Sequence, residues 1–480
     1  MMKIKEKNSQ NFIFHFLTIS FGTVINIVLG LLITPIITRL VSTEDYGRFS
    51  IFNMYTNIAT MVLCMGLDQA LVRFFYAREE KEYKQGLFRF CLIFPMSVTL
   101  VVSLFFIITD RSGFCRIEFS GAVLLMLCIN IMAAICGRIA ALILRATYQS
   151  KLYVVCQITG KVVYTGVILL ILGLFRIRNF QSLVFSVVCS TISVAVIAMY
   201  YSFDYWTFQP CGTLIKRREI LQYSFPFILS MGVTTIFEAA DKLSLQYLST
   251  YKELGIYSSA MSIIHIFAIV QSAFNILWAP MQTEHYIKNP NDTSFIQRGN
   301  SYITILMFWV GFNLVLFKDI FVLILGKEYR GASYILPFLI FHPIMYTISE
   351  TTCSGIEKSK KSYLNIFVAL GACIVNILGN CIFVPMYGGR GAAISTGVSY
   401  IVFFMIRTIF SNRYYYIDYH LKKLCILIIT TVMFSWFCTF YNFNFITIGL
   451  YMINSMLLVV LYKAEIRELI SIGKEYMKKL

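Results

Sequence analysis

The chain has 480 residues, of which 58% are hydrophobic and only 14% are charged. Soluble domains carry about 25% charged residues, so this composition excludes an ordinary soluble protein and indicates a chain that crosses a membrane repeatedly. The net charge of +17 fits basic loops beside an anionic cytoplasmic leaflet, and we expect no nucleic-acid partner. The cysteines form no Cys-x-x-Cys pair or Cys/His cluster, so no metal site is predicted.

Apolar runs of about 20 residues, long enough to cross the hydrocarbon core as helices, recur along the whole chain. They predict an all-α polytopic membrane protein with about fourteen spans, at residues 12–37, 48–67, 87–109, 119–144, 152–174, 180–201, 222–247, 256–279, 301–323, 333–353, 362–384, 389–407, 420–440 and 444–462. The segments on the N-terminal side of the membrane carry more than twice as many Lys and Arg residues as the opposite segments. This bias places both termini in the cytoplasm.

Two segments about 208 residues apart resemble each other. The first leaves span one and enters span two, and the second does the same for spans seven and eight: Leu40-Val-Ser-Thr-Glu-Asp-Tyr-Gly47-Arg-Phe-Ser50 and Leu248-Ser-Thr-Tyr-Lys-Glu-Leu-Gly255-Ile-Tyr-Ser258. Lys151-Leu-Tyr153 and Lys361-Ser-Tyr363, which begin spans five and eleven, have nearly the same offset. Gly47 and Gly255 are therefore expected at equivalent outer turns of two similar halves.

Six spans are an even number, so both halves insert in the same orientation and should be related by an axis along the membrane normal. We expect an N-terminal six-helix bundle at 1–201, a cytoplasmic linker at 202–221 and a second six-helix bundle at 222–412. Residues 413–480 then supply two additional transmembrane helices and a cytoplasmic tail. Substrate sites of many transporters lie where such halves meet.

The order and spacing of several motifs resemble a known family. These motifs are Pro35-Ile-Ile-Thr-Arg39-Leu-Val-Ser-Thr-Glu-Asp-Tyr-Gly47, Tyr223-Ser-Phe-Pro226, Asp241-Lys242 and Pro385-Met-Tyr-Gly388-Gly-Arg-Gly391-Ala-Ala393. Over essentially the whole chain they are similar to bacterial polysaccharide flippases, the O-antigen and capsule exporters of the multidrug/oligosaccharidyl-lipid/polysaccharide (MATE-like) superfamily.

The resemblance implies transport of undecaprenyl-pyrophosphate-linked oligosaccharide repeat units from the cytoplasmic to the outer leaflet of the bacterial plasma membrane. This transport serves the synthesis of surface polysaccharides such as O-antigen of lipopolysaccharide, capsule or exopolysaccharide. The implied partners are the lipid-linked oligosaccharide, membrane lipids, and the polysaccharide polymerase and chain-length proteins. No cofactor and no catalytic residue is expected.

An anionic pyrophosphate needs cations where water is scarce, and a charged side chain at membrane depth is a functional candidate by default. Arg138 and Arg145 lie one heptad apart on span four, and Lys161 lies near the middle of span five. These three are the predicted pyrophosphate contacts. Arg145 is close enough to the cytoplasmic end to extend to the interface instead, and Arg138 and Lys161 both have the alternative of pairing with a buried carboxylate.

Span seven holds Glu238, Asp241 and Lys242 on one helix face. A carboxylate there could bind H⁺ or Na⁺ and couple transport to an ion gradient, or the cluster could neutralise itself. Glu350, near the inner end of span ten, is a weaker candidate for the same role. Arg39 is expected as an interfacial anchor or part of an outer gate, and Arg407 as an anchor.

Three other functions remain open. A cation-coupled multidrug exporter of the same superfamily usually has twelve spans, and a peptidoglycan lipid II flippase is hard to separate by sequence. A membrane glycosyltransferase or polymerase is less consistent with the chain, because such enzymes usually need a large outer loop and every loop here is short. We therefore expect a transporter without covalent chemistry.

Overall fold

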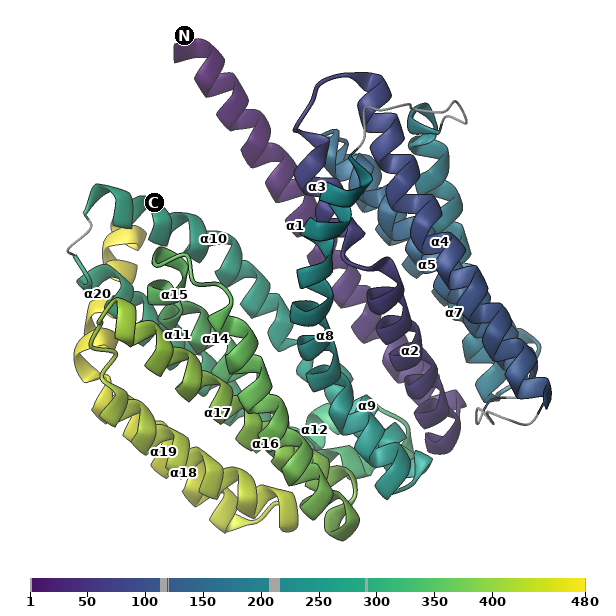
Figure 1. The fold of residues 1–480 in the computed structure, drawn as a ribbon. Helices are drawn as coiled ribbons and strands as arrows, with labels where there is room; N and C mark the ends of the chain where they lie inside the picture. Colours follow the sequence, from purple (N-terminus) through teal and green to yellow (C-terminus); the bar gives the residue numbers. More distant parts are fainter. Residues whose placement is uncertain (1, 113–118, 120, 207–215, 290–291, 480) are drawn as a thin grey trace. The chain divides into compact units, whose positions relative to one another are not determined.

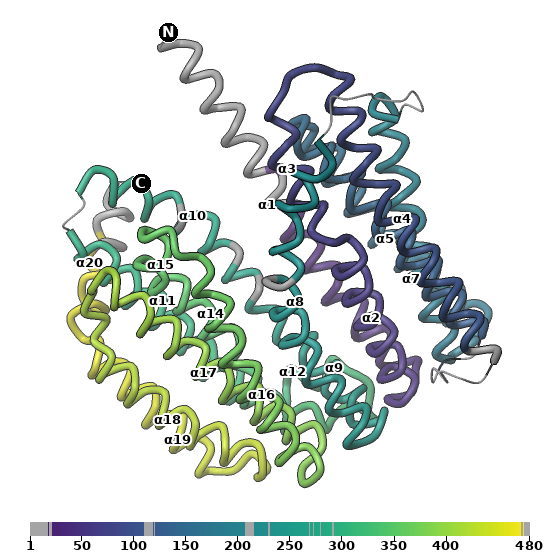
Figure 2. Tube along the Cα trace, viewed as in Figure 1, coloured from purple at the N-terminus to yellow at the C-terminus, as the bar shows by residue number. Residues whose placement is uncertain are grey.

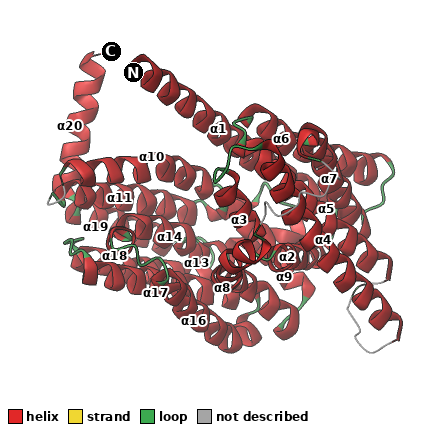
Figure 3. Ribbon diagram, turned by 45° about the horizontal axis from the view of Figure 1, so that its top comes forward, coloured by secondary structure: helices red, strands yellow, loops and turns green. Residues whose placement is uncertain are grey.

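The computed structural model describes residues 2–112, 119, 121–206, 216–289 and 292–479, and the regular structure in these ranges is helical (Figure 3). Eleven helices are long and apolar enough to cross a membrane, and three bent helix pairs raise the number of candidate spans to 14. The expected fold class, an all-α polytopic membrane protein, is confirmed.

The chain forms two compact units. The first comprises Met1–Ile33 and Leu40–Ala239, and the second comprises Thr34–Arg39 and Ala240–Leu480. The main division falls inside a helix, after Ala239. Part of the linker expected at 202–221 lies outside the described residues, so the proposed six-plus-six-plus-two domain boundaries stay a prediction.

The first unit is built from long helices, several of which run side by side, as α4, α5 and α7 do in Figure 1. Its elements are α1 (Met2–Leu40), α2 (Thr43–Cys64), α3 (Leu67–Phe75), α4 (Lys81–Ser112), α5 (Gly121–Ala146), α6 (Ser150–Ile168), a wider π-type turn η1 (Leu169–Leu174), α7 (Phe180–Tyr201), a short 3₁₀ turn η2 (Phe203–Tyr205) and the first part of α8 (Arg217–Leu248).

Apart from Thr34–Arg39 of α1, the second unit begins within α8. It continues with α9 (Tyr251–Ile264), α10 (Phe267–Lys288), α11 (Ser294–Leu316), α12 (Lys318–Val322), a 3₁₀ segment η3 (Lys327–Tyr334), α13 (Leu336–Leu339), α14 (Phe341–Thr352), α15 (Ser354–Lys358), α16 (Leu364–Tyr387), α17 (Gly389–Tyr414), α18 (Leu421–Phe440), α19 (Phe445–Leu461) and α20 (Lys463–Lys479). The α16–α17 pair runs side by side along its length (Figure 2). Its turn is tight: a Cβ on Gly391 would lie 2.1 Å from the carbonyl oxygen of Phe383.

The repeated segments begin their helices in the same way. The side chain of Ser42 accepts a hydrogen bond from the Asp45 amide at the start of α2, and the side chain of Thr250 accepts one from the Glu253 amide at the start of α9. Such N-caps satisfy amide groups that have no partner within the helix, and the nearby acids suit its positive end.

The two repeat glycines differ from the expectation that they occupy turns. Gly47 and Gly255 are each the fifth residue of α2 and α9, and both are buried. Neither backbone has a positive φ. The turns themselves consist of residues 41–42 and 249–250, so the repeat marks capped helix starts with a buried small residue one turn inside.

The span predicted at 48–67 contains a bend near its C-terminal end. The α2 and α3 axes differ by 50°, because Met65 and Gly66 both take left-handed backbone angles, with φ of 52° and 69°. Gly66 also lies against α8, where a Cβ would approach the carbonyl oxygen of Ser224 to 2.5 Å. Only glycine combines this conformation with such a close backbone contact.

Candidate functional site

The first unit joins α3 to α5 through an ion pair at membrane depth. Arg138 on α5 donates from Nε at 3.0 Å and from Nη2 at 2.5 Å to the same carboxylate oxygen of Asp68. Asp68 is buried, whereas 42% of the Arg138 side chain is exposed. The alternative considered for Arg138, pairing with a buried carboxylate, is therefore present, and its exposed part remains open to a second anion.

Lys161 lies eleven residues after Ser150, the first residue of α6. It is therefore near the middle of this helix, and it is half-buried. No described carboxylate lies within ion-pair distance of its ammonium group. The neighbouring Gly160 fixes this turn against α7: its carbonyl accepts a 2.7 Å bond from Ser190, and a Cβ there would meet Val194 at 2.5 Å. Among the described residues, Lys161 is thus an unpaired cation in a well-packed part of the first unit.

The other predicted cations lie nearer to helix ends. Arg145 is exposed in the last turn of α5, and its guanidinium lies 5.6 Å from the ring centre of Tyr153. Arg39 is exposed in the last turn of α1. Cations in the last turn of a helix are stabilised by the negative end of the helix dipole.

The second unit contains a buried carboxylate with an unusual number of donors. Asp241 Oδ2 accepts hydrogen bonds of 2.6 Å from both Tyr257 and Thr396, and Oδ1 accepts bonds of 2.9 Å from the amides of Asn376 and Asn380. The four partners come from α9, α16 and α17. The side-chain oxygen of Asn380 is buried and has no hydrogen-bond partner among the described residues, so the cluster has acceptor capacity to spare.

The other two members of the span-seven cluster do not share this environment. Glu238 is exposed and Lys242 is half-buried, while Asp241 alone is buried. The common helix face expected from their spacing is therefore divided: Asp241 is buried inside the second unit, Lys242 of the same unit is half-buried, and Glu238 belongs to the first unit. Of these three candidates for ion coupling, Asp241 is the only one that is buried, and its role in coupling stays a prediction.

Arg407 is not the interfacial anchor expected from the sequence. It is buried in α17, and its Nη1 donates to Glu350 at 2.7 Å and to Ser349 at 2.9 Å on α14. The pair satisfies two charges that would each be costly alone at this depth. Glu350, the weaker candidate for ion coupling, is thus neutralised by a cation.

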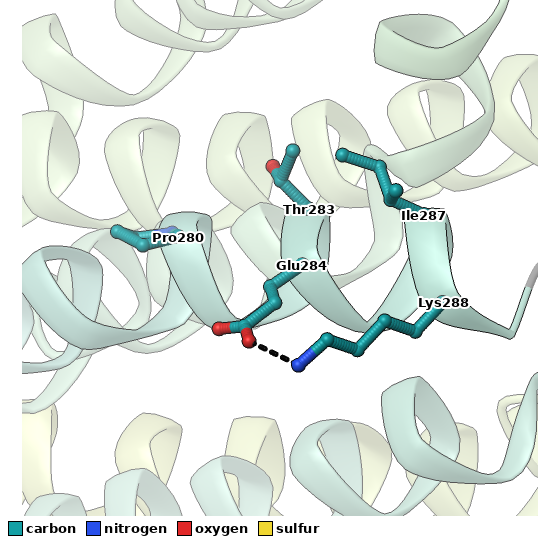
Figure 4. Close-up of a pocket in the computed structure, with 5 residues that line it drawn as sticks. All are labelled: Pro280, Thr283, Glu284, Ile287 and Lys288. Carbon is teal, nitrogen blue, oxygen red and sulfur yellow. Dashed lines mark hydrogen bonds and ion pairs between the residues drawn. The ribbon is translucent and has the colours of Figure 1, made fainter. Parts of the chain in front are cut away.

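An open hollow lies along one side of α10 and is lined by Pro280, Thr283, Glu284, Ile287 and Lys288 (Figure 4). All five residues belong to one helix. Glu284 and Lys288 pair with each other at 2.5 Å. Because no second element supplies a wall and the two charges are satisfied, we assign no ligand to this hollow.

The sequence interpretation missed the partners that make these sites: Asp68, Tyr257, Asn376, Asn380 and Thr396. One available signal was the pair Asn376 and Asn380, which are spaced i, i+4 inside an otherwise apolar run. Such a pair lies on one helix face, and amides at membrane depth need internal partners.

Comparisons with known proteins agree with this architecture. The model of a family described as polysaccharide biosynthesis protein matches residues 14–282, more than half of the chain. No curated protein matches significantly.

Several solved structures share the fold. One is the lipid II flippase MurJ in an inward closed conformation, with a TM-score of 0.72 and 14% identity, covering 94% of this chain and 100% of that chain. Multidrug resistance transporters of the MATE family are also similar. The inward-facing form has a TM-score of 0.60 and 13% identity, and the match covers 83% of this chain and 97% of that chain. The outward-facing form has a TM-score of 0.53 and 16% identity, and the match covers 83% of this chain and 95% of that chain. At these identities the similarity concerns the fold.

Proposed function

Because the chain belongs to the polysaccharide biosynthesis protein family, we propose that it is a flippase for undecaprenyl-pyrophosphate-linked oligosaccharide repeat units. It moves them from the cytoplasmic to the outer leaflet of the bacterial plasma membrane for surface polysaccharide synthesis. Both termini lie in the cytoplasm in this proposal. The protein works by alternating access and makes or breaks no covalent bond.

The observation that carries the proposal is the ammonium of Lys161 in the middle of α6, which pairs with none of the described carboxylates. An isolated cation at membrane depth costs free energy unless an anion occupies the same space for part of the cycle. A pyrophosphate is such an anion. Arg138 adds the outer part of a guanidinium that Asp68 only partly neutralises, and its planar donors suit phosphate oxygens.

We also propose that transport is coupled to H⁺ or Na⁺, and the Asp241 cluster supports this coupling. The carboxylate of Asp241 and the hydroxyl oxygens of Tyr257 and Thr396 are hard oxygen ligands, and the free side-chain oxygen of Asn380 adds one more. Binding a cation there would reorganise the contacts that hold α8, α9, α16 and α17 together. A site of this kind therefore biases the packing of a whole unit, as coupled transport requires.

The test is a deletion strain assayed for lipid-linked sugars by leaflet-specific labelling. We expect repeat units to accumulate on the cytoplasmic leaflet, and export to return with the intact protein but not with Lys161→Ala. Lys161→Arg should restore part of the export because it keeps the charge. Lys288→Ala is the matched control: this lysine is exposed and paired with Glu284, so its loss should leave export unchanged.

Other outcomes separate the competing functions. Normal polysaccharide export with altered drug resistance would support a multidrug exporter instead. Accumulation of peptidoglycan precursors with normal surface polysaccharide would support a lipid II flippase. Full rescue by Lys161→Ala would overturn the pyrophosphate assignment while leaving the flippase function standing.

A further inference from the structure

Helices α14 and α17 of the second unit face each other through a ladder of aromatic and polar side chains. On α14 the positions are spaced i, i+4, i+8, and on α17 they are spaced i, i+3, i+7, so each set lies on one helix face. We call this set the rung strip; its three rungs are His342 with Tyr400, Tyr346 with Phe403, and Glu350 with Arg407.

The rungs are close enough to form one continuous surface. The ring centres of His342 and Tyr400 are 4.2 Å apart, and those of Tyr346 and Phe403 are 5.9 Å apart and nearly parallel. The guanidinium of Arg407 lies 5.7 Å from the ring centre of Phe403. Eight residues of α14 at 1.5 Å each give the strip a length of about 12 Å.

The rung strip is partly open, although it lies within candidate spans. His342, Tyr346, Glu350 and Phe403 are half-buried, and 22% of the Glu350 side chain is exposed. An ionised or imidazole group on a lipid-facing surface is strongly disfavoured, and such groups at membrane depth face a water-filled or substrate-filled space. The strip is therefore not a lipid-contacting surface.

The neighbouring helix α16 shows what a lipid-contacting surface of the same unit looks like. Five of its large apolar side chains are more than half exposed: Phe367, Ile374, Leu378, Ile382 and Met386. On α17 itself, Met405 and Ile409 are exposed on a different side from Phe403 and Arg407. The polar and aromatic groups are thus concentrated on one face.

We propose that the rung strip binds the sugar part of the transported molecule. Aromatic rings can cover the apolar C–H faces of sugar rings, and a carboxylate and a guanidinium bond to neighbouring hydroxyl groups. The Glu350–Arg407 pair uses one oxygen of the carboxylate and one nitrogen of the guanidinium, so further acceptor and donor atoms remain for hydroxyls. This inference rests on the proposed flippase function, and it assigns the oligosaccharide to the second unit.

The test compares two probes on the purified full-length protein in nanodiscs. One probe is undecaprenyl pyrophosphate, and the other is the undecaprenyl-pyrophosphoryl oligosaccharide accumulated by the deletion strain, with its sugars identified by mass spectrometry. The double substitution Tyr346→Ala and Phe403→Ala should weaken binding of the oligosaccharide-bearing lipid about tenfold, the factor given by ~1.4 kcal/mol of lost contact. Binding of undecaprenyl pyrophosphate should not change.

Three further variants make the result decisive. Tyr346→Phe keeps the ring and should bind both probes like the unaltered protein. Phe367→Ala removes an equal ring from the lipid-facing side of α16 and should also change neither. Where the double variant does not purify, Tyr346→Leu keeps apolar volume without the ring and should still lose the sugar-bearing probe selectively.

Equal weakening of both probes, or of neither, overturns the assignment of the strip to sugars. If the double variant instead loses binding of a flat cationic dye such as ethidium selectively, the rung strip serves drug export. That result would also overturn the assignment of the strip to sugars. Failure of the deletion strain to accumulate a lipid-linked oligosaccharide contradicts the proposed function itself, so the two failures are distinguishable.

Discussion

Replacing Asp241 tests whether its carboxylate holds the second unit together. In Asp241→Ala, four donors lose their acceptor. Three of them have another partner: Thr396 also bonds to the carbonyl of Ala392, Tyr257 lies 3.2 Å from Thr396, and Asn380 bonds to Asn376. Of the four donors, only the amide nitrogen of Asn376 is left without an acceptor among the described residues.

The size of the destabilisation in Asp241→Ala follows from the number of donors that are left without an acceptor. An unpaired buried donor costs about 1–3 kcal/mol, and the missing carboxylate adds a small cavity, while removing a buried charge offsets part of the loss. We expect Asp241→Ala to lower the free energy of unfolding by about 3 kcal/mol. In Asp241→Asn the new amide can donate to the two hydroxyls, which also accept, so the loss should be about 1 kcal/mol or less.

Thermal unfolding of the detergent-solubilised protein measures the difference. For a unit of roughly 240 residues, about 3 kcal/mol corresponds to a fall in apparent melting temperature of about 6–12 °C. Melting in sodium chloride against choline chloride then tests the ion site. Na⁺ at a hundredfold excess over its dissociation constant would add about 2.7 kcal/mol of stability, and Asp241→Asn should abolish this increment.

Three results would contradict this reasoning. If Asp241→Ala melts like the unaltered protein, the carboxylate is not a hub of hydrogen bonds. If Asp241→Asn melts as low as Asp241→Ala, charge and not hydrogen-bond geometry stabilises the cluster. Sodium-dependent stabilisation that survives in Asp241→Asn would place the ion elsewhere.

Three further predictions concern other parts of the chain. Arg138→Gln leaves the buried Asp68 carboxylate without its cation and should destabilise the protein by about 2–4 kcal/mol. Adding Asp68→Asn should restore the melting temperature. If the double variant also restores lipid export in the deletion strain, Arg138 has only a structural role. Gly66→Ala places a Cβ 2.5 Å from a backbone oxygen at φ of 69° and should lower the free energy of unfolding by about 2 kcal/mol or more. Gly30→Ala is the control, because a Cβ there would meet no atom within 4 Å, and it should change the melting temperature little. Equal effects of the two substitutions would contradict the close contact at Gly66. Burial lowers the pKa of Lys358 to about 8, although its ammonium lies near two tyrosine rings. Acylation of this lysine, measured by mass spectrometry, should therefore reach half its maximum near pH 8, and a midpoint near that of exposed lysines would contradict this. The stability of the protein should fall as pH decreases from about 10 toward 8, because the unfolded state binds the proton more tightly.

The spans and their repeat could be predicted because both depend on residues close together in sequence. Continuous apolar runs predicted about fourteen crossings, and the capped starts of α2 and α9 produce the match that Gly47 and Gly255 first indicated. The bend at Gly66 could not be predicted, since it depends on contact with Ser224, far along the chain.

The sites were predicted less completely, because each depends on a partner distant in sequence. Asp68 lies just beyond the expected end of span two, so a boundary error of a few residues hid the carboxylate that pairs with Arg138. Arg407 was expected to reach the interface because hydropathy considers each helix alone, and Glu350 lies 57 positions away. Asp241 was identified from its position in an apolar span, but its amide partners were not.

The capped turns also bear on how the chain enters the membrane. Only two residues separate α1 from α2, and only two separate α8 from α9. Ser42 and Thr250 each define the start of the next helix through an acceptor bond to a residue three positions later. Each turn can therefore form while the ribosome is still synthesising the more C-terminal spans, so each half begins its insertion as a helical hairpin whose geometry is encoded locally.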